Sequence, residues 1–159
     1  MSDDVPADRP VLQLRLVVEA EDYDEAVAFY RDVLGLPEQV AFEGEGEARV
    51  AILEAGRATL EIANPAQKRM IDDVEVGRQT SARMRVAFEV TDSQGATDRL
   101  VAAGATLVAA PTETPWRSLN ARLDAPGGLH ITLFQELETL DERRARTGFG
   151  TEADRQGGA

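Results

Sequence analysis

Residues 14–36, LRLVVEAEDYDEAVAFYRDVLGL, and residues 84–106, MRVAFEVTDSQGATDRLVAAGAT, decide the fold of this chain because they repeat each other at an offset of 70 residues. Identical residues stand at four corresponding positions: Arg15 with Arg85, Glu19 with Glu89, Asp22 with Asp92, and Ala26 with Ala96. Repetition at a fixed spacing is the sequence signature of a duplicated structural unit. The chain is therefore predicted to contain two copies of one module.

Each copy begins as a strand and continues as a helix. In the first copy, residues 11–20 alternate between apolar and polar side chains, and residues 23–34 carry apolar side chains at helical spacing. Asp22 is a suitable N-cap for that helix, and Gly35 is placed to end it. Three short strands separated by glycine-rich turns are expected within residues 38–65. One module is therefore βαβββ.

The second copy repeats this order, with strands expected at residues 105–111, 118–125 and 128–136. We therefore predict an α+β fold in which two βαβββ modules, at about residues 11–64 and 83–138, form a cupped, roughly eight-stranded mixed sheet. Helices are expected on the convex face of that sheet. The concave face, lined by alternate residues of the strands, is the default binding site.

Three segments lie outside the two modules. Residues 1–10 are polar and contain prolines, and residues 139–159 are charged and glycine-rich, so both are expected to be flexible. Residues 65–82 join the modules, and Asn64 and Pro65 suit the cap and first turn of a short helix. The joining segment is expected to be either a plain linker or a flap over a pocket.

The composition excludes several classes of function. The chain has no cysteine and a single histidine, His130, which excludes disulfides, thiolate zinc sites, cysteine nucleophiles and a histidine-rich metal site. A net charge of -12 argues against binding to nucleic acid, and it suits a cationic ligand unless the acidic residues serve solubility alone. No apolar run is long enough to enter a membrane, and the first residues do not read as a signal peptide. A cytoplasmic location is expected.

Five motifs, taken in their order, resemble one known superfamily: AFYRDVLGL at residues 28–36, MRVAFEVTD at 84–92, AAGAT at 102–106, TPWRSLNARL at 114–123 and LDAPGGLHITLFQE at 123–136. Together they resemble the vicinal oxygen chelate superfamily, which includes glyoxalases, bleomycin-resistance proteins, extradiol dioxygenases and fosfomycin-resistance enzymes. The resemblance implies a single glyoxalase/bleomycin-resistance-like domain over residues 11–138 and, commonly, a homodimer.

The resemblance also indicates where a metal would be held. Metal-dependent members carry four ligands on strands that face the cup, and the corresponding positions here hold Arg15, Glu61, Arg85 and Thr132, of which only Glu61 keeps a ligand type. Divalent ions need oxygen or imidazole donors, whereas arginine is a fixed cation without a lone pair. We therefore predict no metal and no other cofactor.

Arg15 and Arg85 are expected to flank Glu61 inside the cup. The three charges then form either a mutually neutralised, hydrogen-bonded cluster or an anchor whose remaining positive charge holds an anionic or oxygen-rich small molecule.

The last strand and residues 116–120, around the start of the strand before it, supply further cup-lining candidates. His130 and Thr132 share one face of the strand because side chains alternate with period two. A single histidine on a strand is more often a packed residue than a general base, which needs suitable geometry as well as a suitable pKa. Trp116 is expected to supply an aromatic wall, or else core packing or a dimer contact, and Asn120 a hydrogen-bonding amide.

Three functions follow from these residues and from the resemblance. The favoured one is a metal-independent small-molecule binding protein of the glyoxalase/bleomycin-resistance type, which holds a drug or metabolite in the cup. The first alternative is a metal-dependent lyase or dioxygenase of the same superfamily with an atypical ligand set, such as Glu61 with His130. The second is a non-catalytic scaffold or regulatory module. An open pocket would favour binding, whereas a cup filled by side chains would favour the scaffold.

Overall fold

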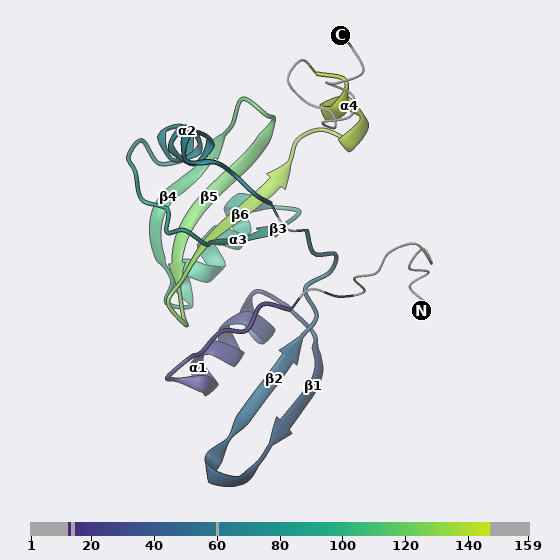
Figure 1. Cartoon of the computed structure of the whole chain (residues 1–159), viewed down its shortest axis with the longest axis vertical. Helices are drawn as coiled ribbons and strands as arrows, with labels where there is room; N and C mark the ends of the chain where they lie inside the picture. The colour runs from purple at the N-terminus through teal and green to yellow at the C-terminus, as the bar shows by residue number, and fades with distance from the viewer. Residues whose placement is uncertain (1–12, 14, 60, 147–159) are drawn as a thin grey trace.

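The computed structural model describes residues 13, 15–59 and 61–146 and has the predicted α+β class (Figure 1). The strands form two sheets, one with two antiparallel strands in the order β1-β2 and one with four mixed strands in the order β3-β6-β5-β4. Among the described residues, none of the helices has the length and hydrophobicity needed to span a bilayer.

The first module contains a helix and a hairpin. Helix α1, Tyr23–Val27, continues as a π-helical segment, η1, Ala28–Val33. The side chain of Asp22 accepts a hydrogen bond from the backbone N–H of Glu25, and Gly35 adopts a φ of 91° just beyond the helix, so both expected helix ends are confirmed. The hairpin consists of β1, Glu38–Glu43, and β2, Arg49–Leu53, with the 3-10 turn η2, Glu45–Glu47, between them.

The second module has the predicted βαβββ order in full. Its elements are β3, Val86–Glu89; α3, Ser93–Ala102; β4, Thr106–Glu113; β5, Ser118–Ala125; and β6, Leu129–Glu136. Asp92 caps α3 by accepting from the N–H of Gly95, as Asp22 does for α1. Strand β6 is parallel to β3 and antiparallel to β5, so it lies inside the sheet.

The strands differ from the expected single eight-stranded sheet. The described residues form six strands in two sheets, and residues 15–20 and 61–64, predicted as strands, have no strand structure. Residues 11, 12, 14 and 60 lie outside the described residues. An alternating sequence becomes a strand only where a neighbouring strand completes its backbone hydrogen bonds, and residues 16–18 are exposed instead. The two outer strands of the first module are therefore missing from the described sheet.

The hydrophobic core lies on one face of the four-stranded sheet, where α3 and η1 cover it. It includes Phe29 from η1, Leu100 from α3, Leu123 from β5, and Ile131 and Leu133 from β6. The two modules thus share one core.

One hydrogen bond ties the modules together at a turn. The hydroxyl of Tyr30, at the centre of η1, donates to the backbone carbonyl of Pro126 at 2.7 Å, in the turn between β5 and β6. Burial raises the pKa of Tyr30 to about 12, so the phenol stays protonated and able to donate.

Helix α2, Pro65–Glu75, lies on the opposite face of the same sheet. Leu123 of β5 points into the core beside α3, whereas its neighbour Arg122 contacts Glu75 of α2. Because adjacent residues of a strand point to opposite faces, the two helices sandwich the sheet. Helix α2 is the short helix expected from Asn64 and Pro65 in the joining segment, and it lies on the face opposite to the core. The buried polar residues of α2 contact the polar side chains that the strands present on this face.

The segment after β6 is folded at its start, in contrast to the flexible tail expected at residues 139–159. Helix α4, Leu140–Arg144, begins with a reciprocal capping box between Thr139 and Glu142. Arg143 pairs with Glu136 and Glu138. The expected flexible arm at residues 1–10 and the rest of the tail, residues 147–159, lie outside the described residues.

Candidate functional site

The polar face of the four-stranded sheet carries the candidate site. On β5 it presents Asn120, Arg122 and Asp124, and on β6 it presents His130 and Thr132. The strand register sets Arg122 beside Thr132 and Asp124 beside His130. Arg122 is fully buried, and Thr132 is nearly so. A charged side chain therefore stands in the middle of the sheet under α2.

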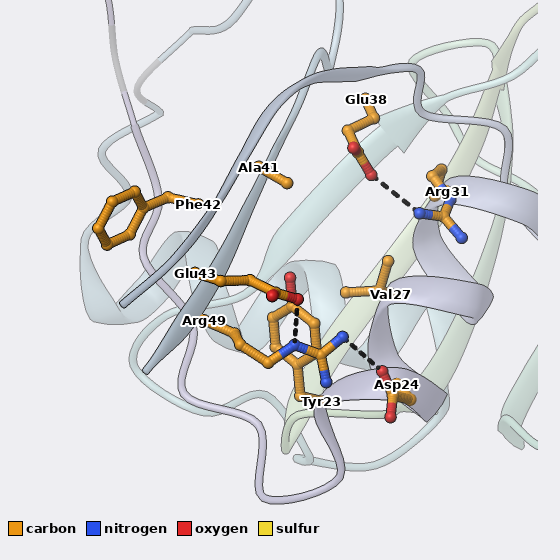
Figure 2. A pocket seen from close by; sticks show the side chains of 9 residues that line it. All are labelled: Tyr23, Asp24, Val27, Arg31, Glu38, Ala41, Phe42, Glu43 and Arg49. Atoms are coloured by element: carbon orange, nitrogen blue, oxygen red, sulfur yellow. Dashed lines mark hydrogen bonds and ion pairs between the residues drawn. The ribbon is translucent and has the colours of Figure 1, made fainter. Parts of the chain in front are cut away.

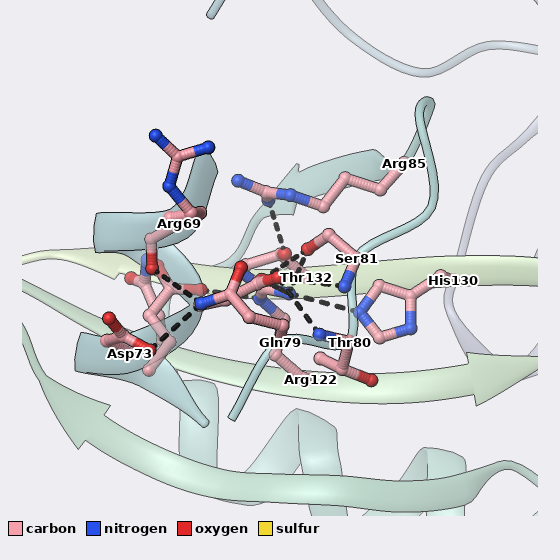
Figure 3. Close-up of polar contacts among 12 residues, drawn as sticks. Arg69, Asp73, Gln79, Thr80, Ser81, Arg85, Arg122, His130 and Thr132 are labelled. Atoms are coloured by element: carbon pink, nitrogen blue, oxygen red, sulfur yellow. Dashed lines mark hydrogen bonds and ion pairs between the residues drawn. The ribbon is translucent and has the colours of Figure 1, made fainter. Parts of the chain in front are cut away.

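Four residues hydrogen-bond to the guanidinium of Arg122. Its Nε donates to Oε2 of Glu75 at 2.5 Å, and its Nη1 reaches Oδ1 of Asp72 at 3.2 Å and Oγ of Ser81 at 2.8 Å. Nη1 also lies 3.1 Å from Nε2 of His130. We call Arg122 with Asp72, Glu75, Ser81, Asn120 and His130 the Arg122 cluster (Figure 3). Arg122 is thus matched by two carboxylates, as a buried charge requires.

Local sequence explains how α2 delivers these carboxylates. Asn64 caps the helix by accepting from the N–H of Gln67 at 2.9 Å, and Pro65 stands at its first position, as expected. Asp72 and Glu75 are three residues apart, so they share one face of the helix. Gly77, with a φ of 82°, then turns the chain back toward the sheet.

The returning chain completes the environment of Asp72. Its Oδ2 accepts from the backbone N–H groups of Thr80 and Ser81 at 3.0 and 2.9 Å, and its Oδ1 accepts from the Ser81 hydroxyl at 2.5 Å. Burial by itself would raise the pKa of Asp72, but these hydrogen bonds and the charge of Arg122 outweigh it and lower the pKa to about 2. The segment at residues 65–82 is therefore ordered against the sheet.

His130 is oriented on both sides of its ring. Arginine has no lone pair, so the Nη1 of Arg122 must donate to Nε2 of the imidazole. The other nitrogen, Nδ1, lies 3.0 Å from Oδ1 of Asp124 and must therefore carry the proton that it donates. Both nitrogens of His130 are thus engaged, in an arrangement that fits the tautomer with its proton on Nδ1.

Arg85 contributes a second cation to this face. Its Nη1 donates to Oγ1 of Thr132 at 2.7 Å, and in the described part of the chain no carboxylate lies within ion-pair distance of its guanidinium. Burial lowers the pKa of Arg85, as does the positive charge of Arg122, while Glu75, Glu61 and Asp72 oppose the shift from farther away. Arg85 therefore keeps unused N–H groups in a half-buried position.

The structure brings together some of the predicted site residues and not others. Arg85, Asn120, His130 and Thr132 gather on the polar face, with the Nδ2 of Asn120 donating to Oε1 of Glu75 at 2.6 Å. Trp116 is half-buried in the turn between β4 and β5, and its backbone carbonyl accepts from Arg143.

The expected Arg15, Glu61 and Arg85 cluster is not formed. Arg15 is exposed and donates to the side chain of Gln13 at 2.9 Å, and Glu61 is exposed as well. The cluster needed strands at residues 11–20 and 58–65 to aim these side chains into the cup, and the described parts of both segments lack strand structure. The buried ion cluster is centred on Arg122 instead.

Sequence reasoning missed Arg122, Asp72 and Glu75. Arg122 stands two residues after Asn120 in the β5 sequence, so period-two alternation puts it on the same face as Asn120, and this signal could have identified it. The acidic pair on α2 has helical spacing, but that spacing does not reveal which surface the helix covers.

The residues at the positions of the superfamily's metal ligands do not fit a divalent ion. Arg85 and Thr132 bond each other, and a guanidinium offers no lone pair. Across the residues that the structure describes, no group of three histidine, aspartate or glutamate side chains is arranged to hold a metal ion.

Among the hollows of the described structure, two are lined by other residues than the cations of the polar face. One, of about 340 Å³, lies between α1 and the hairpin (Figure 2), where Arg49 sits 4.3 Å from the ring centre of Tyr23 and pairs with Asp24. The other, of about 510 Å³, lies beside the turn that joins β5 to β6. The middle of the polar face is filled by α2 and is not an open cup.

Comparison with known proteins identifies the family. The profile of the glyoxalase-like domain matches residues 15–134 of the 159 residues, which span both modules. The chain belongs to the glyoxalase-like domain family. This confirms the resemblance to the vicinal oxygen chelate superfamily. No curated protein is similar enough to this glyoxalase-like chain to be matched.

Solved structures with the same fold include three bacterial proteins at 20% identity. An antibiotic binding protein from a Streptomyces species has a TM-score of 0.53, over 80% of this chain and 98% of its own. A glyoxalase family protein from Bacillus cereus has a TM-score of 0.52, over 84% of this chain and 100% of its own. A member of the glyoxalase/bleomycin resistance protein/dioxygenase superfamily from Sphaerobacter thermophilus has a TM-score of 0.50, over 76% and 92%.

Proposed function

We propose that this protein is a metal-independent small-molecule binding protein of the glyoxalase/bleomycin-resistance type, which holds a drug or metabolite against the polar face of its four-stranded sheet. The observation that carries the proposal is Arg85, a half-buried cation whose hydrogen bond goes to the neutral hydroxyl of Thr132. Buried charges are normally paired, so a half-buried guanidinium with unused N–H groups favours an anionic partner.

The ligand class follows from the geometry of a guanidinium. Its planar fork matches a carboxylate or phosphate in a bidentate arrangement, and Thr132 fixes one edge of the Arg85 fork. We therefore expect the ligand to carry a carboxylate, phenolate or phosphate. The fold shared with an antibiotic binding protein supports a ligand of drug size.

The decisive variant is Arg85→Gln, compared with Arg83→Gln as a matched control. Arg83 is exposed and two residues away, so both variants remove one positive charge from the same segment. Small acids and drug-like anions are first screened by thermal shift on the wild type, and hits are measured by calorimetry. Arg85→Gln is expected to weaken binding at least tenfold, since a charge-assisted hydrogen bond contributes about 1.5–3 kcal/mol, while Arg83→Gln leaves it unchanged. Equal affinities in the two variants would reject Arg85 as the anchor.

Metal independence has a separate test. Elemental analysis of the purified protein is expected to find no stoichiometric transition metal, and chelation is expected to leave ligand binding intact. A stoichiometric bound metal would overturn this part of the proposal.

One observation favours a second candidate, the non-catalytic scaffold. Asp72 and Glu75 of α2 fill the polar face, and a cup filled by side chains is what a scaffold requires. In that case the ligand screen yields nothing that Arg85→Gln weakens, and the protein's role lies in its outer surfaces.

The exposed apolar surface of the first module supports a homodimer. Large hydrophobic side chains are exposed on the segment before α1, on the hairpin and on the segment after it: Leu16, Val17, Val40, Phe42, Val50 and Ile62. Val17 and Ile62 are 89% and 88% exposed, which is uncommon for a stable monomer surface. We propose that a second copy of the chain covers this surface and pairs with residues 15–20 and 61–64.

A further inference from the structure

The charges on the polar face cancel only while α2 is in place. Arg122 and Arg85 supply two positive charges, and Asp72 and Glu75 supply two negative ones. Both carboxylates come from α2, so the sheet by itself would present two arginines on either side of Thr132. The middle of the closed face is therefore neutral, whereas the uncovered middle carries a double positive charge, with the exposed Asp124 at its edge beyond His130.

In the described part of the chain, three buried side-chain atoms have no hydrogen-bond partner: Oγ of Ser93 on α3, and two atoms on the polar face of the sheet. The two on the polar face are Nη2 of Arg122, a donor, and Oδ1 of Asn120, an acceptor. Both residues lie on the same face of β5 and are at least nine-tenths buried. A buried donor or acceptor without a partner is unfavourable, so α2 satisfies the hydrogen-bonding groups of this face incompletely.

Polar contacts contribute most of the attachment of α2 to the sheet. Of its eleven residues, Ile71, Asp72 and Glu75 are buried, and Ile71 is the one apolar side chain among them. Exchanging the two carboxylates of α2 for those of a ligand would leave both arginines paired, so displacement of the helix need not expose an unpaired buried charge.

We propose that Arg122 and Arg85 form a dianion-binding subsite whose Arg122 half is occupied by Asp72 and Glu75 as built-in carboxylates, and that a small dicarboxylate or phosphate enters it by displacing α2. The inference rests on the proposed function, because it places the ligand on the same face of the sheet. It adds Arg122 and Asn120 to the ligand contacts and makes residues 65–82 the lid of the site.

The test uses Glu75→Gln, with Asp73→Asn as its matched control. Glutamine keeps the size of Glu75 and an acceptor for Arg122, but it removes one of the competing charges. Asp73 lies on the exposed side of the same helix and accepts from Gln79 outside the Arg122 cluster, so its variant removes an equal charge (Figure 3). Calorimetry with succinate and with inorganic phosphate is expected to show at least tenfold tighter binding to Glu75→Gln than to Asp73→Asn. Equal affinities in two folded variants would overturn the proposal.

Hydrogen exchange on the wild type gives a readout that needs no variant. The backbone N–H groups of Thr80 and Ser81 donate to Asp72, so they are protected while α2 is closed. Saturating succinate is expected to speed their exchange, and unchanged protection with bound succinate would contradict a displaced lid. A natural ligand that depends on Arg85 but leaves these amides protected would reject the lid and preserve the proposed function. If Glu75→Gln binds succinate more tightly but Arg85→Gln does not weaken that binding, Arg85 is rejected as the anchor.

Discussion

Glu75 on α2 and Arg122 on β5 are 47 residues apart in the chain, yet Oε2 of one lies 2.5 Å from Nε of the other, and both side chains are almost fully buried. This ion pair joins the segment between the modules to the middle of the second module. It also holds α2 over the polar face of the sheet. The same contact therefore affects both the stability of the fold and the access of a ligand to the proposed site.

Replacing Arg122 with methionine should destabilise the protein by about 3–5 kcal/mol, because Asp72 and Glu75 would remain buried without their cation. Urea denaturation measures the loss. The triple variant Arg122→Met, Asp72→Asn, Glu75→Gln should recover much of it, since it removes all three charges together. A cost below about 1 kcal/mol for the single variant would show that the pair is not buried in solution.

Asp72 should make stability depend on pH in the acid range. Its pKa is about 2 in the folded chain against an ordinary value of 3.8, so its contribution is fully present above about pH 5 and is lost as pH falls through about 2. The shift corresponds to about 2 kcal/mol. The difference in unfolding free energy between wild type and Asp72→Asn, measured from pH 7 to pH 2, should shrink over that window. A difference that does not vary with pH would contradict the low pKa.

His130 should be found as the neutral tautomer protonated at Nδ1, because Arg122 donates to Nε2 and Asp124 accepts from Nδ1. The chain has one histidine, so a long-range proton–nitrogen spectrum at neutral pH contains a single, unambiguous pattern. Asp124→Ala removes the acceptor at Nδ1 and should weaken the preference. A proton on Nε2 in the wild type would be incompatible with the contact to Arg122.

Phe42→Asp should dissociate the proposed homodimer, because Phe42 is 63% exposed on the hairpin and a carboxylate there would be buried at the interface. Sedimentation velocity on wild type and variant should show a dimer and a monomer. Val101→Gln is the control, since Val101 is also an exposed apolar residue but lies on α3 of the second module. A monomeric wild type would remove the basis of this prediction.

Features governed by neighbouring residues could be predicted from the sequence. The caps at Asp22, Asn64 and Asp92 were each expected or placed at predicted helix starts, and each side chain accepts a hydrogen bond from the backbone N–H three residues later. The alternation that set His130 and Thr132 on one face of β6 also holds. Both kinds of feature depend on local backbone geometry alone.

The candidate site could be predicted only in part. His130 and Thr132 share one face of β6 because strand alternation is local, whereas Arg85 was indicated by the resemblance to the superfamily. The helix that covers the polar face could not be predicted. The pairing of Arg122 with α2 depends on which surface the helix covers, and the sequence does not show that surface. The expected cluster with Arg15 failed for the same reason, since it required two strands whose partners the sequence does not specify.

The sequence by itself determined the duplication, the α+β class, the family and the shared face of His130 and Thr132, because repeats and periodic patterns are properties of the chain in order. Only the tertiary structure decided that α2 covers this face and that Asp72 and Glu75 pair with Arg122. It also decided that Arg85 hydrogen-bonds to Thr132 and to no carboxylate among the described residues. A buried charge is stable only with a partner at hydrogen-bond distance, and that partner is selected by packing between segments far apart in the chain.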